Sequence, residues 1–297
     1  MDDSKPEHAA PRRVLAGAHG SDAFKFGDLT ERKKHHRDPF AIFLPNRVVS
    51  RATMRTIVVV EVAFALLIWF NSPFKVLPQP GEVIRALGNL WTKEGLGEEL
   101  ITSFMMNVEA LSWSAAISLV LAYMTVLPVC RPIVVALSKG RFLSMIGFST
   151  VFTIMLGGGH QLKTALLVYG ITVFFVTSMA SVIAGIPKAE FDHARTLRMS
   201  EWRVVWEVVV LGTADKAFEV LRQNAAMGWM MLAMVEGIVK SEGGVGVMLI
   251  AQDKYFHLAE VFAIQIVILV VGLSQDAFIG LIRHAVCPYA DLTLERK

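Results

Sequence analysis

The chain has 297 residues, of which 54% are apolar and 19% are charged, and its mean hydropathy is +0.51. A water-soluble domain carries about 25% charged and 45–50% apolar residues, so this composition argues against an ordinary soluble protein. The net charge of +3 is small, and no basic stripe interleaved with aromatic residues indicates a nucleic-acid partner. Apolar residues gather in runs of about 20, the length that crosses a bilayer core. These runs predict an all-α membrane protein with several spans.

Residues 1–50 are polar and charged and are expected to form a largely disordered cytoplasmic tail. A basic cluster at 32–37 fits a signal that holds the tail on the inner side of the bilayer; a lipid or nucleic-acid patch is the alternative. The first apolar run begins near Thr56, behind a tail too long for a secretory signal, so it is expected to remain as an anchor. The membrane domain is placed at 51–290, followed by a short tail at 291–297.

Six apolar segments predict six transmembrane helices. Lys139 and Arg141 interrupt the third segment, which is therefore the weakest. A short helix is expected around Glu82–Trp91, and the polar-apolar stretch 187–214 with Trp202 and Trp206 predicts a helix against a protein or membrane surface. The six segments are 53–71, 101–128, 134–157, 162–185, 215–239 and 260–283.

The orientation of the spans follows from the positions of lysine and arginine. With the N-terminus inside, 22 of the 29 basic residues fall in inner regions and six in outer loops. Because inner loops are enriched in these residues, the N-in/C-in topology is preferred.

Motifs of soluble chemistry are missing from the sequence. There is no GxxxxGK[ST] loop for a nucleotide, and the histidines lack the spacing of a metal site. Gly157–Gly159 is interpreted as a tight reversal at the outer end of the third span. Cys130 and Cys287 are far apart and are expected to be reduced, ordinary residues at the inner membrane edge. We expect no catalytic residue, metal or cofactor.

Ionisable residues inside apolar spans are costly and therefore indicate functional positions. Seven stand within or near the spans, namely Glu61, Glu109, Glu219, Arg222, Glu236, Glu260 and Asp276. Glu219 and Arg222 are three residues apart and are able to pair with each other on one helical face. Candidates for a translocation pathway are Glu109, Arg222, Gln223, Asn224 and Glu236.

Four fragments of the sequence resemble, in the correct order, the permease subunits of binding-protein-dependent ABC importers. Residues 192–203 read DHARTLRMSEWR and are similar to the cytoplasmic EAA loop, which in the nitrate, sulfonate and taurine branch tends to read EAARTLGASxW. Residues 76–83, VLPQPGEV, are similar to the LPxPxEV stretch after the first span. Residues 236–238 (EGI) and 243–246 (GGVG) resemble the EMI and GLG region, and Asp276 stands where the last span commonly carries an acid. The resemblance covers about residues 70–285.

This resemblance implies a type I ABC importer permease of the cell inner membrane, which is a transport subunit and not an enzyme. Its implied partners are a cytoplasmic ABC ATPase dimer, a second permease copy, a periplasmic or extracytoplasmic substrate-binding protein and the lipid bilayer. The implied solute is small, with nitrate, a sulfonate or taurine as examples. A coupling helix at about Lys188–Ser200 would dock on the ATPase through Asp192, Ala194, Arg195, Leu197, Arg198 and Met199.

The sequence departs from the family pattern at several positions. Arg198 occupies the position of the loop glycine and implies a different or strained turn, Leu211 replaces the closing proline, and His193 replaces a small alanine. Two alternatives therefore stay open: a permease-like scaffold or sensor that does not transport, and an ion-coupled carrier that uses Glu109, Arg222 or Glu236.

Overall fold

The structure is a computed structural model that describes residues 51–71 and 77–288. The predicted tail at 1–50 with its basic cluster, and residues 291–297, lie outside these described residues. The chain divides after Val62 into two units, and the first unit contributes only the beginning of helix α1 to the described residues. The second unit holds every other described element.

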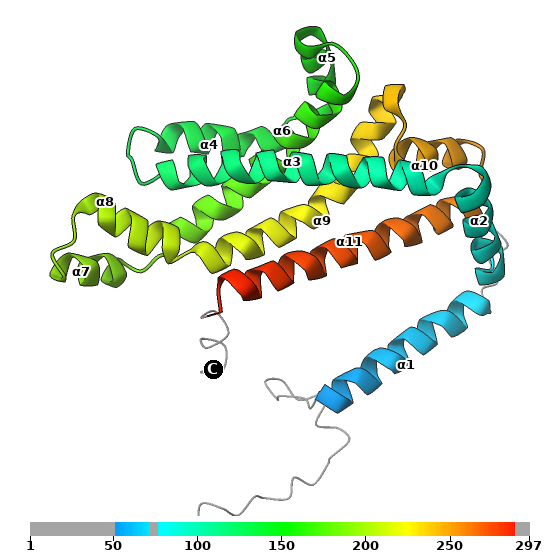
Figure 1. The fold of residues 1–297 in the computed structure, drawn as a ribbon, viewed down its shortest axis with the longest axis horizontal. Coiled ribbons are helices and arrows are strands. Elements are labelled where there is room, and N and C mark those ends of the chain that lie inside the picture. Colours follow the sequence, from blue (N-terminus) through cyan, green and yellow to red (C-terminus); the bar gives the residue numbers. More distant parts are fainter. Residues whose placement is uncertain (1–50, 72–76, 289–297) are drawn as a thin grey trace, which may run out of the picture. The chain divides into compact units, whose positions relative to one another are not determined.

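Every regular element in the described residues is helical, as the composition predicts (Figure 1). The longer helices are α1 (Arg51–Phe70), α2 (Pro80–Lys93), α3 (Leu96–Met124), α5 (Met145–Leu156), α6 (His160–Ala184), α9 (Ala214–Ile238), α10 (Val245–Lys254) and α11 (Leu258–Val286). The shorter ones are α4 (Arg131–Lys139), η3 (Gly140–Phe142), α7 (Lys188–Thr196), α8 (Glu201–Val204), the π-helical η4 (Val205–Leu211) and η5 (Lys240–Glu242).

Four of these helices are long and apolar enough to cross a membrane: α1, α3, α6 and α11. A fifth span results if α4, η3 and α5 are counted together, although this pair of helices is bent by 112°. The third predicted span is therefore not one straight helix, and the break falls after the two cations that interrupt the segment, Lys139 and Arg141. By length and composition, the described part of the chain thus has four to five candidate spans, as expected for a multi-pass membrane protein.

The fifth predicted segment, 215–239, is confirmed as a helix, α9, although α9 is not among the spans. Asp215, Lys216, Glu219, Arg222 and Glu236 make this helix more polar than its neighbours. The six-span count and the N-in orientation remain predictions.

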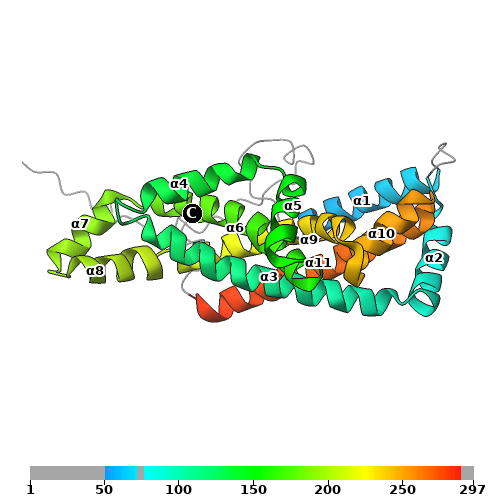
Figure 2. The same cartoon turned by 90° about the horizontal axis from the view of Figure 1, so that it is seen from above.

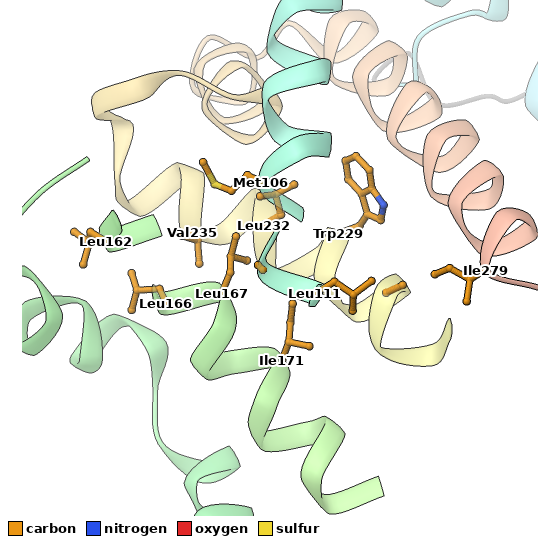
Figure 3. Packing of buried hydrophobic residues seen from close by; sticks show 12 residues of the cluster. Met106, Leu111, Leu162, Leu166, Leu167, Ile171, Trp229, Leu232, Val235 and Ile279 are labelled. Carbon is orange, nitrogen blue, oxygen red and sulfur yellow. The ribbon is translucent and has the colours of Figure 1, made fainter. Parts of the chain in front are cut away.

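The core of the second unit lies where α3, α6 and α9 pack together with α11 (Figure 3). Leu166 and Ile171 of α6 and Leu232 of α9 are nearly inaccessible to solvent there. Helices α3 and α6 run parallel, and two serines of α3 donate hydrogen bonds to α6 carbonyls: Ser114 to Val168 (3.2 Å) and Ser118 to Thr172 (3.4 Å). Small hydroxyl residues let two helices approach closely and add polar contacts, as is usual between membrane helices.

The two ends of the second unit carry different elements. Figure 2 shows α7 and α8 at one end and α2 and α10 at the other. A second apolar cluster, with Leu90 of α2 and Ile264 of α11, closes the α2–α10 end. The predicted helix at Glu82–Trp91 is confirmed as α2, and Glu82 accepts a hydrogen bond from the backbone N–H of Gln79 (3.0 Å) at its start. By the predicted topology the α7–α8 end is the inner one.

Candidate functional site

Helices α9 and α11 are joined by a ladder of ion pairs. The Nε of Arg222 lies 2.9 Å from the Oδ1 of Asp276, and its Nη2 lies 3.6 Å from the Oε1 of Glu219. The other oxygen of Glu219 lies 3.2 Å from the Nη1 of Arg283. The predicted pairing of Glu219 with Arg222 is therefore confirmed. The two partners on α11 could not be found by spacing, because they lie far away in the sequence.

This ladder lies on a partly open face of the helices. Arg222 and Asp276 are 39% and 43% exposed. Even on the most lenient insertion scales, a charge at the centre of a bilayer costs about 2.5–3.5 kcal/mol, so a face with four charges is poorly suited to contact with lipid tails. A groove of about 490 Å³ runs beside the ladder between α9 and α11. It is lined by Ala226, Trp229, Met230, Ala233, Gln265, Ile268, Leu269, Gly272, Leu273 and Asp276.

The two residues that follow Arg222 point in different directions. Gln223 is exposed, whereas Asn224 is buried and donates a hydrogen bond to the carbonyl of Val220 (2.8 Å). The Oδ1 of Asn224 is buried without a hydrogen-bond partner. Of the three successive polar residues, Arg222 and Gln223 therefore reach the open side of α9, and Asn224 faces the core.

A buried amide network crosses the bundle next to the groove. The Oε1 of Gln275 accepts hydrogen bonds from the Nδ2 of Asn107 (3.1 Å) and the Nε1 of Trp229 (2.7 Å). Gly228 leaves room for Asn107, because a Cβ added there would lie 2.6 Å from the Oδ1 of Asn107. Sequence reasoning missed Gln275, although it stands directly before Asp276 in an otherwise largely apolar helix.

Glu236 lies in a different place, at the α2–α10 end. It is fully buried and accepts hydrogen bonds from the Oγ of Ser103 (2.6 Å) and the backbone N–H of Gly246 (2.7 Å). Lys163, also fully buried, donates to the carbonyl of Gly243 (2.8 Å) and interacts electrostatically with Glu236. Three helices thus hold the start of α10, and we refer to Ser103, Lys163, Glu236 and Gly243–Gly246 as the α10 clasp.

The glycines of the α10 clasp are required by its geometry. Gly243 and Gly244 have φ of 69° and 112°, which L-residues rarely adopt. A Cβ on Gly244 would lie 2.3–2.7 Å from the carboxyl group of Glu236. The Glu-Gly and Gly-Gly fragments that carry the resemblance therefore form one packed unit. Glu236 belongs to this unit and does not line the α9–α11 groove.

Glu109 lies on yet another face. Its Oε2 is 2.9 Å from the Nε2 of His160, whose Nδ1 lies 3.9 Å from the Oε2 of Glu242. These side chains are about half exposed, and Glu109 and His160 line a groove of about 360 Å³ between α3 and α6. Gly157 and Gly159 beside them have φ of 80° and 85°, so the predicted tight reversal is confirmed.

At the opposite end, α7 and α8 form a short helix–turn–helix unit outside the long helices, and we refer to residues 188–204 as the lever segment. The helix predicted for Lys188–Ser200 ends earlier, at Thr196, because the chain turns at Arg198. Arg198 has φ of 55°, the conformation that the glycine of the resembled loop would favour. The prediction of an unusual turn at this position is confirmed.

Arg195 braces the turn of the lever segment. Its Nε and Nη2 donate to the two oxygens of Glu201 (3.1 and 3.2 Å), and its Nη1 lies 3.6 Å from Asp192. The hydrogen bond to Glu201, with the negative charge of that group, raises the pKa of Arg195 above its ordinary value. Bidentate pairs of this kind fix the geometry of both side chains.

The remaining predicted coupling residues divide into an anchoring and an exposed group. Ala194 is buried and faces the protein, whereas Leu197 is 59% exposed although it is apolar. Asp192 and Arg198 are exposed and Met199 is half-buried. A groove of about 450 Å³ lies between α7 and η4, and Leu197 and Met199 are among its lining residues.

The lever segment continues into α9 through a π-helix. The backbone N–H of Gly212 donates to the carbonyl of Glu207 (3.0 Å), five residues back, and η4 ends at Leu211. Such π-helical turns are rare and frequently occur at functional positions. The π-helix ends at Leu211, where the resembled permeases carry a proline, and α9 begins three residues later at Ala214.

Metal and redox sites do not emerge from the described residues: no group of three or more His, Cys, Asp or Glu is placed to hold an ion, and Cys130 and Cys287 form no disulfide. No protein-family model matches the sequence, and a search of curated proteins gives no significant match.

Proposed function

We propose that this chain is the transmembrane permease subunit of an ABC importer, which moves a small solute across the inner membrane by alternating access. A separate cytoplasmic ATPase dimer would supply the energy, a second permease copy would complete the pathway, and an extracytoplasmic binding protein would deliver the solute. Nitrate, sulfonates and taurine are the solutes that the sequence resemblance suggests.

The observation that carries the proposal is the exposed lever segment and its connection to α9. A permease must convert closure of the ATPase into movement of its helices, so the contact element must be stiff and must reach a helix that lines the pathway. Arg195 and Glu201 stiffen the turn, and the apolar side chain of Leu197 projects from it. Burial of such a side chain against a partner is favourable, about 25 cal/mol per Å² of apolar surface.

The pathway is assigned to the α9–α11 face. Arg222, Asp276 and Gln223 are ill-suited to lipid tails but suited to a wet cavity between two copies. The groove on the other side of α11, toward α3, is about 810 Å³ and almost wholly apolar, with Ile101, Met105 and Phe278 among its lining residues. That side is assigned to lipid.

The test is uptake driven by ATP, combined with co-purification of the ATPase. Leu197→Glu places a charge on the exposed contact surface without disturbing the Arg195 brace, and we expect loss of both ATPase association and uptake. Ile84→Glu is the matched control, because Ile84 is 70% exposed on α2 at the opposite end of the unit. It should retain association and uptake.

Three outcomes would contradict the proposal. Unchanged uptake in Leu197→Glu would show that the lever segment is not the coupling element. Uptake that follows an ion gradient without any ATPase would favour the ion-coupled carrier. An ATPase that remains bound while no solute moves under any condition would favour the non-transporting scaffold.

A further inference from the structure

An apolar groove of about 650 Å³ lies between the C-terminal end of α3 and the segment formed by α8 and η4. It is separate from the α9–α11 face and from the surface of Leu197. Its lining is aliphatic and aromatic and includes no charged residue: Ala116, Leu119, Val120, Tyr123, Met124, Val126, Leu127, Trp202, Val205, Trp206 and Val210.

Two tryptophans stand open at this groove. Trp202 and Trp206 are 72% and 58% exposed, and they lie one helical turn apart. Tryptophan is enriched at the boundary between hydrocarbon and headgroups, because its ring is apolar and its indole N–H is polar. Since α3 is one of the candidate spans and ends beside the groove, the groove opens at the level of one bilayer interface.

The α3 side of the groove carries positive charge and no acidic residue. No aspartate or glutamate occurs between Glu109 and Glu190, whereas Arg131 follows closely on the end of α3. The Nε of Arg131 donates to the carbonyl of Thr125 (3.0 Å), which holds its guanidinium next to the lining residues 124 and 126. On the second wall, formed by α8 and η4, Arg203 follows Trp202 in the sequence and is 66% exposed, but it is not among the lining residues.

The acids nearest to this second wall are already engaged. Glu201 pairs with Arg195, and Glu207 lies 3.9 Å from Arg203, at the limit of an ion pair between exposed groups. Exposed pairs of this kind contribute little and exchange readily with other charged groups. The mouth of the groove therefore combines an apolar interior with the guanidinium group of Arg131 beside its α3 wall.

We propose that this groove binds one anionic phospholipid, with an acyl chain along the apolar lining and the phosphate beside Arg131. The lipid would then contact both the inner end of α3 and the segment that links the lever to α9. The inference rests on the membrane character of α3 and does not require that an ATPase drives the protein.

The experiment uses the full chain in nanodiscs that contain brominated phospholipids, whose bromine atoms quench tryptophan fluorescence on contact. Brominated phosphatidylglycerol, which is anionic, is compared with brominated phosphatidylcholine, which has no net charge. We expect stronger quenching by the anionic lipid, with a preference of about fivefold in relative affinity from the contact of Arg131 with the phosphate. In the double variant Trp202→Phe/Trp206→Phe this preference should disappear.

Trp113→Phe is the matched control. Trp113 is also 58% exposed but lies in the groove between α3 and α6, so its removal should reduce quenching by both lipids equally. Arg131→Gln should lower the anionic preference about fivefold, while Arg131→Lys, which keeps the charge, should retain most of it.

Equal quenching by the two lipids in the wild-type protein, or a preference that survives Trp202→Phe/Trp206→Phe, would overturn the proposal. So would binding of an acidic protein partner that protects both tryptophans from quenching by either lipid. Because uptake is not measured, a negative result here leaves the transport proposal standing, and a failed uptake test leaves this one standing.

Discussion

Replacement of Glu236 distinguishes a structural clasp from a pathway residue. In Glu236→Ala the Oγ of Ser103 and the N–H of Gly246, both buried, lose their acceptor. A buried polar group left without its hydrogen-bond partner costs about 1–3 kcal/mol, so the loss of both hydrogen bonds is expected to cost about 3–5 kcal/mol. For a domain of about 150–250 residues, 1 kcal/mol shifts the unfolding temperature by about 2–4 °C, so we expect a decrease of about 6–20 °C.

Thermal unfolding in detergent, followed by intrinsic fluorescence, measures this shift. Glu236→Gln keeps one acceptor oxygen and should lose roughly half as much stability. Glu98→Ala is the control, because Glu98 lies near the start of α3 and outside the clasp. An unfolding temperature in Glu236→Ala within about 2 °C of wild type, together with loss of uptake, would refute the clasp and restore Glu236 to the pathway.

Three further tests apply the same unfolding assay to other parts of the structure. Gly228→Ala should lower the free energy of unfolding by about 1 kcal/mol, because overpacking against Asn107 outweighs the better helix propensity of alanine. Gly280→Ala is the control, because the space around Gly280 is open, and it should raise stability or leave it unchanged. The reverse order of the two stabilities would contradict the packing around Gly228. Arg198→Gly should raise the free energy of unfolding by about 0.5–1 kcal/mol, because glycine adopts the left-handed backbone conformation of this position without strain. A decrease would show that contacts of the arginine side chain stabilise the protein more than its backbone strain destabilises it. Arg222→Leu should lower uptake with a shift below about 4 °C, because its ion pairs are partly exposed; a larger shift with normal uptake would mark a purely structural role.

Local features of the fold could be predicted from the sequence because they depend on neighbouring residues. The reversal at Gly157–Gly159 and the turn at Arg198 each followed from the backbone conformation that a position requires. The helix at Glu82–Trp91 and the long helix at 215–239 followed from apolar spacing. The bend of the third segment was signalled by Lys139 and Arg141, but its angle was not, because packing against α6 determines where α5 points.

The assembly of the polar residues could not be predicted in the same way. Glu219 and Arg222 were recognisable as an i, i+3 pair, yet Asp276 and Arg283 join them from another helix. The rotation of each helix about its axis decides such contacts, and hydropathy does not record it. Glu236 is the clearest case, since its hydrogen-bond partner Ser103 is 133 residues away in the sequence.

The most direct test of the proposed coupling role determines on which side of the membrane the lever segment lies and whether a partner covers it. Leu197→Cys, made in a chain with Cys130 and Cys287 replaced by alanine, can be labelled with a membrane-impermeant maleimide in sealed vesicles of both orientations. We predict labelling only in inside-out vesicles, and protection from labelling when the cognate ATPase is bound. Labelling of this cysteine in right-side-out vesicles would contradict a coupling role for the lever segment.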